Sequence, residues 1–187
     1  MDPSQLEDYF QLVDEGREAA PEGFEVRLGM ESDFFPGMEP WLEALHRRAD
    51  FHYILGSVHW QMPEYRKAFW RGDIRAFQRQ YFEHLAESAE SGLFDALAHP
   101  DLIKNADPET WDPTHLEDFL SEILDRIART GVAMELNTSG INKIYPEMNP
   151  GPYLLRLMRE RQIPVVVGSD SHSPRRVGAG FPAALDL

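Results

Sequence analysis

The sequence alternates short apolar runs with amphipathic segments of helical period, and this alternation most constrains the fold. Five apolar runs stand out, at residues 24–30, 53–58, 94–98, 132–136 and 163–168. The segment that follows the second run has large apolar residues about one helical turn apart, at Phe69, Ile74, Phe77, Tyr81 and Leu85. Short strands alternating with helices are typical of parallel βα units rather than of an antiparallel sheet.

Residue types suited to metal or proton chemistry follow each predicted strand. They are Glu31, His59, His99, Asn137, and the pair Asp170 and His172. A (β/α) barrel gathers such residues from many strands at one rim, whereas a doubly wound sheet gathers them at one switch point. We therefore expect an α/β fold, an incomplete TIM-like barrel forming a single domain over residues 1–187. A closed barrel needs about 250 residues, so about five units predict a truncated chain.

Five of these side chains predict a divalent metal site. Asp170 and His172 lie two residues apart beyond a buried strand, so both side chains leave on one side. Taken alone, the Asp170 and His172 pair is as consistent with an aspartate that caps a turn beside an unrelated histidine as with a metal site. Glu31, His59 and His99 at the same rim favour metal ligation. Oxygen and nitrogen ligands suit Zn, Mn or Fe, and thiolate sites are excluded because the chain has no cysteine.

Cations follow the last two predicted strands in a chain that is acidic as a whole. Lys143, Arg175 and Arg176 lie there, while 18 basic against 32 acidic residues give a net charge of −14. This negative charge argues against a nucleic-acid partner. The sequence has no phosphate-loop motif, so we expect no nucleotide cofactor. The chain has no cysteine, no apolar run long enough to cross a membrane and no signal-peptide pattern at its N-terminus, so we expect a cytoplasmic protein. His46, His84 and His115 are expected on solvated helix faces.

Five motifs together resemble the polymerase and histidinol phosphatase (PHP) family, in its histidinol-phosphatase branch. They are Leu28-Gly29-Met30-Glu31-Ser32-Asp33, Gly56-Ser57-Val58-His59, Ala98-His99-Pro100-Asp101, Glu135-Leu136-Asn137-Thr138-Ser139-Gly140 and Gly168-Ser169-Asp170-Ser171-His172. The resemblance implies a distorted (β/α)7 barrel with up to three divalent metals, which hydrolyses a phosphomonoester such as histidinol phosphate in histidine biosynthesis.

The resemblance also implies a role for each site residue. Glu31 is similar to a carboxylate that bridges two metals, and the other implied metal ligands are His59, His99, Asp170 and His172. Glu31, Asp170 and His172 form the implied catalytic set. Substrate or phosphate contacts are implied for Asn137, Lys143, Arg175 and Arg176.

The chain departs from the family pattern in its first part. The N-terminal His-x-His and two further histidines are absent. We therefore expect one well-ligated metal, a chain truncated at the N-terminus and also at the C-terminus, and poor activity. Exposed sheet edges predict a homo-oligomer. Two alternatives stay open: a noncatalytic PHP scaffold that binds a partner, or a phosphoesterase for another small phosphomonoester or nucleotide.

Overall fold

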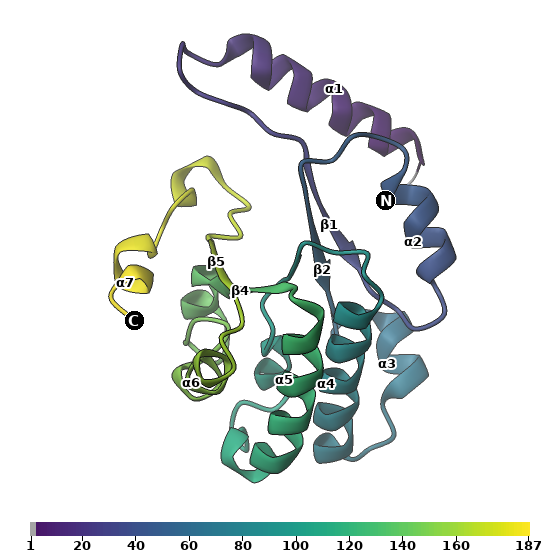
Figure 1. Ribbon diagram of the computed structural model, residues 1–187, viewed down its shortest axis with the longest axis vertical. Helices are drawn as coiled ribbons and strands as arrows, with labels where there is room; N and C mark the ends of the chain where they lie inside the picture. Colours follow the sequence, from purple (N-terminus) through teal and green to yellow (C-terminus); the bar gives the residue numbers. More distant parts are fainter. Residues whose placement is uncertain (1–2) are drawn as a thin grey trace.

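The computed structural model describes residues 3–187 and contains a five-stranded parallel sheet (Figure 1). The strands lie side by side in chain order, from β1 to β5. This order is that of a βα barrel, because a doubly wound sheet reverses its order at the switch point. The strands are β1 (Gly29–Asp33), β2 (Tyr53–Ser57), β3 (Ala96–Leu97), β4 (Ala133–Asn137) and β5 (Val165–Gly168).

Helices precede the sheet and connect its strands. The α-helices are α1 (Pro3–Ala19), α2 (Glu39–His46), α3 (Pro63–Phe69), α4 (Ile74–Glu90), α5 (Glu117–Thr130), α6 (Pro152–Glu160) and α7 (Phe181–Leu185). Short 3₁₀ turns are η1 (Leu102–Ala106), η2 (Pro113–Leu116), η3 (Thr138–Asn142) and η4 (Pro174–Arg176). Every helix within residues 3–187 is too short or too polar to span a bilayer.

Local chemistry sets the ends of the two long helices behind the sheet. The Asp73 carboxylate accepts backbone N–H bonds from Arg75 and Ala76, which caps the start of α4. Helix α5 ends at Gly131, whose φ of 75° is the left-handed conformation that glycine adopts without steric cost. These features set the start of α4 and the end of α5, the two helices that cover one face of the sheet.

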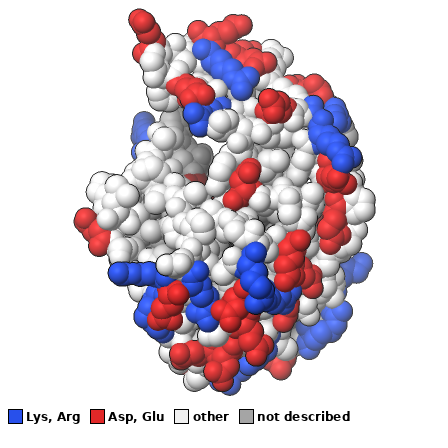
Figure 2. Space-filling model, in the orientation of Figure 1, with Lys and Arg blue, Asp and Glu red and all other residues white. Residues whose placement is uncertain are grey.

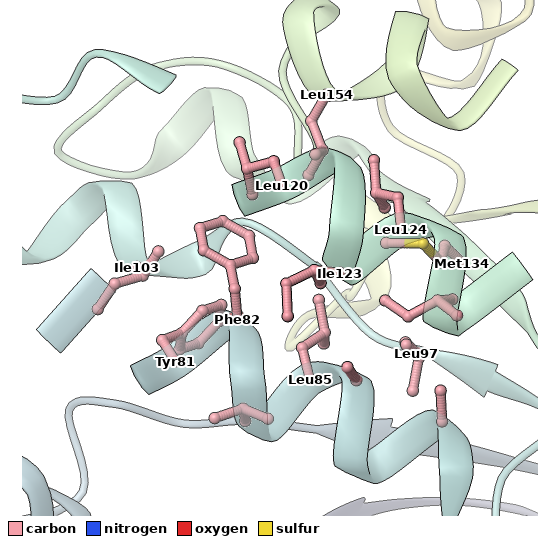
Figure 3. Close-up of a cluster of buried hydrophobic side chains, with 14 of the residues drawn as sticks. Tyr81, Phe82, Leu85, Leu97, Ile103, Leu120, Ile123, Leu124, Met134 and Leu154 are labelled. Carbon is pink, nitrogen blue, oxygen red and sulfur yellow. The ribbon is translucent and has the colours of Figure 1, made fainter. Parts of the chain in front are cut away.

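The core lies between the sheet and helices α4 and α5. Registered neighbours on β3 and β4, Leu97 and Met134, point into it and are fully buried. Figure 3 shows them beside Leu85 of α4 and Ile123 and Leu124 of α5. Burial of each such side chain contributes roughly 1.5–3 kcal/mol, so this face stabilises the domain. Because side chains alternate along a strand, the opposite face remains for polar residues.

The first predicted strand is misplaced. It was expected at residues 24–30, ending at Glu31, whereas β1 runs over Gly29–Asp33 with Glu31 at its centre. The partner strand decides the difference, because β2 pairs Tyr53 with Gly29 and Ser57 with Asp33. Residues 24–28 precede that register and lie outside the ladder. The third predicted strand is shortened to two residues, and the other three agree within about two residues.

The expected exposure of three helix histidines is partly wrong. His84 of α4 is buried, at 2% exposure, because Tyr65 and Phe69 of α3 pack against it. His46 is half-buried, and its Nε2 lies 2.9 Å from the Ser32 hydroxyl. His115 is exposed as expected, but it lies in the 3₁₀ turn η2 rather than in a helix. The packing of α3 against α4 therefore buries His84, although its polar neighbours in the sequence predicted an exposed side chain.

Candidate metal centre

Strand register places the first candidate ligand on the face of the sheet opposite the core. Ser32 is registered with Gly56, Gly56 with Leu97, and Leu97 with Met134, so these four share the helix-covered face. Glu31 precedes Ser32 in β1 and therefore points to the other face. Figure 2 shows the molecule hollowed between the part that carries α1, β1 and β2 and the part that carries β5 and α7.

Two imidazoles converge on the Glu31 carboxylate. Oε1 of Glu31 lies 3.1 Å from Nε2 of His99 and 3.6 Å from Nε2 of His59. The two imidazole ring centroids are 4.9 Å apart. Glu31 belongs to β1, His59 follows β2, and His99 follows β3, so three neighbouring strands supply the three side chains. The structure brings Glu31, His59 and His99 together, and their roles as metal ligands stay predictions.

The spacing of these groups fits a divalent ion. One ligand atom from each residue lies within 4.8 Å of the other two. In a tetrahedral zinc site, with bonds near 2.1 Å, neighbouring donor atoms lie roughly 3.4 Å apart. The observed 3.1 and 3.6 Å bracket that value. Two imidazoles and a carboxylate are also a donor set that zinc accepts in catalytic sites, where a fourth position stays open.

Asp33 orients His59 and was missed as a functional residue in the sequence analysis. Nδ1 of His59 makes a short hydrogen bond to Oδ1 of Asp33, which leaves Nε2 facing Glu31. The Ser57 hydroxyl also donates to Oδ1 of Asp33, at 3.3 Å. A carboxylate on the second ring nitrogen fixes the orientation of a metal-binding histidine. The signal was present in the sequence, because Asp33 lies two residues after Glu31 and shares its face of the strand.

The charges within the group act on its pKa values. Burial alone would raise the pKa of Glu31, but the hydrogen bond from His99 and the charges of both imidazoles outweigh it and lower the pKa to about 2. Burial lowers the pKa of His59, but its bond to Asp33 and the nearby carboxylates outweigh burial and raise it. Glu31 is therefore ionised at neutral pH, as metal ligation requires.

Glu135 and Asn137 form a buried polar pair under the His99 backbone. Oε2 of Glu135 accepts the His99 N–H at 2.9 Å and the Asn137 amide at 3.0 Å. Burial raises the pKa of Glu135, although both hydrogen bonds oppose this. The Asn137 side-chain oxygen accepts from Ser139 N–H and Oγ, so the amide groups of Asn137 are engaged inside the protein. Asn137 is buried, and its predicted substrate contact stays a prediction.

Asp170 lies near the three-residue group but outside it. The Ser139 hydroxyl donates to Asp170 Oδ2 at 2.9 Å, and Nε2 of His172 lies 3.1 Å from Asp170 Oδ1. The carboxylate of Asp170 is close enough to His59 to help raise its pKa. The His172 side chain is 87% exposed and Asp170 only 15%. The roles of Asp170 and His172 as ligands stay predictions.

The three candidate phosphate contacts differ in their exposure to solvent. Lys143 and Arg175 are exposed and Arg176 is half-buried. Within residues 3–187, no hydrogen bond or ion pair engages their side chains. On the face shown in Figure 2, acidic and basic side chains intermingle over α4, α5 and α6.

Comparison with known proteins decides the family. Residues 2–139 match the PHP domain family. The chain belongs to the PHP domain family. A curated relative from Deinococcus radiodurans, named probable histidinol-phosphatase, is 35% identical over 97% of this chain and 70% of its own length. A probable histidinol-phosphatase of Clostridium acetobutylicum is 26% identical over 87% of this chain and 66% of its own length.

Solved structures share the fold of this PHP domain. A candidate histidinol phosphatase from Listeria monocytogenes superposes with a TM-score of 0.82, at 22% identity, over 98% of this chain and 77% of its own. Histidinol phosphate phosphatase of Lactococcus lactis, in complex with zinc, L-histidinol and phosphate, gives 0.79 at 18% identity. That match covers 97% of this chain and 72% of the Lactococcus chain. The predicted βα fold is thereby confirmed.

Proposed function

We propose that this chain is a metal-dependent phosphoric monoester hydrolase that converts histidinol phosphate into histidinol and phosphate, in histidine biosynthesis in the cytoplasm. The convergence of Glu31, His59 and His99 carries the proposal. Support for the substrate comes from the relatives named histidinol-phosphatase and from the Lactococcus structure that holds zinc, L-histidinol and phosphate. A small phosphorylated substrate follows from both.

Glu31, His59 and His99 would hold a single well-ligated ion, Zn, Mn or Fe. Such an ion would supply Lewis-acid stabilisation of the charge that develops on the phosphoryl oxygens. The protein's part is to present three donor atoms in fixed positions, with Asp33 holding the ring of His59. We propose that Asp170 and His172 add donor atoms at the same rim.

The reaction transfers the phosphoryl group to water. An oxygen–phosphorus bond forms from water, which gives up a proton, and the bond from phosphorus to the histidinol oxygen breaks. Overall, that oxygen takes up one proton as histidinol leaves, which balances the proton lost by the water. The side chains of Lys143, Arg175 and Arg176 would stabilise the phosphate oxygens, because they carry fixed positive charge and have no competing ion pair within residues 3–187. Catalysis is then mostly positioning and electrostatics.

Metal content and phosphate release together test this proposal. The purified chain should bind one equivalent of Zn²⁺ or Mn²⁺ and release phosphate from histidinol phosphate slowly, and only when metal is added. Glu31→Gln, which removes a ligand at nearly constant shape, should lose both metal and phosphate release. Glu22→Gln, a matched change at an exposed site, should keep both.

Other outcomes separate the alternatives. A chain that binds metal but releases no phosphate would favour a noncatalytic scaffold. Equal rates on histidinol phosphate, other small phosphomonoesters and short nucleotides would contradict the proposed substrate and keep the hydrolase. Absence of bound metal in the unaltered chain would overturn the proposal itself.

A further inference from the structure

We propose that Glu135 is a positioning residue that sets the backbone of His99, so that the His99 imidazole reaches the Glu31 carboxylate. The inference rests on the proposed metal site and adds a residue to it. Glu135 lies on β4, whereas the three candidate ligands come from β1 and from the ends of β2 and β3. Glu135 therefore acts on the site through His99 rather than as a fourth member of the group.

The His99 side chain points away from the face that its position after β3 would give it. Leu97 of β3 points into the helix-covered core. His99 follows two residues later, so a continued strand would send its side chain to the same helix-covered face. Instead His99 adopts a φ of +28°, in the left-handed region that side chains other than glycine rarely adopt. With this turn, Nε2 of His99 lies 3.1 Å from Oε1 of Glu31 on the opposite face.

The Glu135 carboxylate holds this backbone conformation of His99. Oε2 of Glu135 accepts the backbone N–H of His99 at 2.9 Å, and both residues are buried, at 4% and 3% exposure. A strained backbone persists only where its surroundings fix it, and a hydrogen bond between two buried groups is a strong restraint because losing the acceptor would leave the His99 N–H buried and unpaired. The Asn137 amide donates to the same Oε2 at 3.0 Å, which fixes the carboxylate in turn.

The Glu135 carboxylate occupies space that a side chain on β5 would otherwise fill. Gly168 of β5 lies against it, and a Cβ added at Gly168 would stand 1.8 Å from Oε1 of Glu135. Any side chain at Gly168 would therefore displace the carboxylate. The neighbouring strand thus leaves room for Glu135 at the position from which it bonds His99.

Two variants separate positioning from charge. Glu135→Gln keeps the length and an acceptor oxygen but removes the charge, whereas Glu135→Asp keeps the charge but shortens the side chain by one methylene. If Glu135 positions His99, Glu135→Gln should bind Zn²⁺ within about threefold of the unaltered chain. Glu135→Asp should bind it about ten- to a hundredfold more weakly, as for other residues that orient metal ligands.

Leu136→Ala serves as the control for a general loss of stability. Leu136 is the next residue of β4, is buried and points to the other face. Zn²⁺ affinity is measured by competition with a chromogenic chelator, below the melting temperature of each metal-free variant. Leu136→Ala should melt earlier but keep its Zn²⁺ affinity. Equal affinity losses in Leu136→Ala and Glu135→Asp would overturn the proposal, as would loss in Glu135→Gln with retention in Glu135→Asp.

A crystal structure of metal-free Glu135→Asp gives a readout that needs no metal. We expect the φ of His99 to leave the left-handed region and Nε2 of His99 to move away from Glu31. An unchanged His99 would overturn the positioning role. If the unaltered chain binds no Zn²⁺, the proposed function fails, while this comparison still decides whether Glu135 sets the His99 backbone.

Discussion

Acid should destabilise this protein through one buried histidine outside the metal centre. His84 of α4 is 2% exposed, and its two ring nitrogens are both engaged. Nδ1 lies 2.7 Å from the Tyr65 hydroxyl, and Nε2 lies 2.8 Å from the Gln80 amide nitrogen. The neutral imidazole satisfies both contacts, since the Gln80 amide donates to Nε2 and Nδ1–H donates to Tyr65. A second ring proton, on Nε2, would face the N–H of the Gln80 amide, so the charged form of His84 is disfavoured in the folded protein.

The size of the effect follows from the pKa of His84. Burial lowers it from the ordinary 6.5 to about 4. Between these values the unfolded chain binds more protons than the folded one, so the free energy of unfolding falls as the pH falls. The difference of about 2.5 between the two pKa values corresponds to a loss of roughly 3 kcal/mol in the free energy of unfolding once the pH has fallen below both. When the pH falls from 7.5 to 5.5, protonation of His84 in the unfolded chain should lower the free energy of unfolding by about 1.4 kcal/mol.

Urea denaturation of the metal-free chain measures this contribution. The unaltered protein and His84→Gln are compared at pH 7.5 and 5.5, above the isoelectric point of about 4.8. Because a neutral amide does not titrate, the His84→Gln variant should lose about 1.4 kcal/mol less than the unaltered protein over this interval. His115→Gln, at an exposed position, should follow the unaltered protein. Equal losses in all three proteins would refute the reasoning.

Further outcomes follow from the site and from the sheet. Asp33→Ala should lower Zn²⁺ affinity by about ten- to a hundredfold in a calorimetric titration, because His59 loses the acceptor that fixes its ring; an unchanged affinity would contradict the role of Asp33. Gly168→Ala should weaken Zn²⁺ binding by displacing Glu135, and normal binding would show that the carboxylate has room elsewhere. Arg175→Ala should raise KM for histidinol phosphate severalfold, and an unaltered KM would remove Arg175 from the phosphate contacts. Light scattering should give a mass above the 21.5 kDa of one chain. The reason is that β1 and β5 each pair on one side only within residues 3–187, which leaves two sheet edges open to another chain. A monomer at high protein concentration would count against this association.

Periodicity in the sequence predicted the βα order because it records which residues are buried. The apolar runs at residues 53–58, 132–136 and 163–168 all became strands within about two residues. The run at residues 24–30 has the same alternation, but only the register with β2 decides which residues join the ladder. Strand position depends on a partner 24 residues away, so local pattern alone could not fix it.

The candidate ligands were also readable from the sequence, but their supports were not. Glu31, His59 and His99 were found because each lies at or near the end of a predicted strand. The bond from His99 to Glu135 joins residues 36 apart in the chain. It depends on the pairing of β3 with β4 and on the left-handed turn at His99, neither of which a local pattern specifies.

The site's construction makes strand register a condition for metal binding. Each imidazole is held by a carboxylate on a strand other than the one it follows: Asp33 of β1 holds His59 after β2, and Glu135 of β4 holds the backbone of His99 after β3. A slip of one residue in β1 would turn both Glu31 and Asp33 to the helix-covered face, which would remove a ligand and the support of another at once. Zn²⁺ affinity should therefore report sheet register more sensitively than helix content does, because the helices can form while the strands are misaligned.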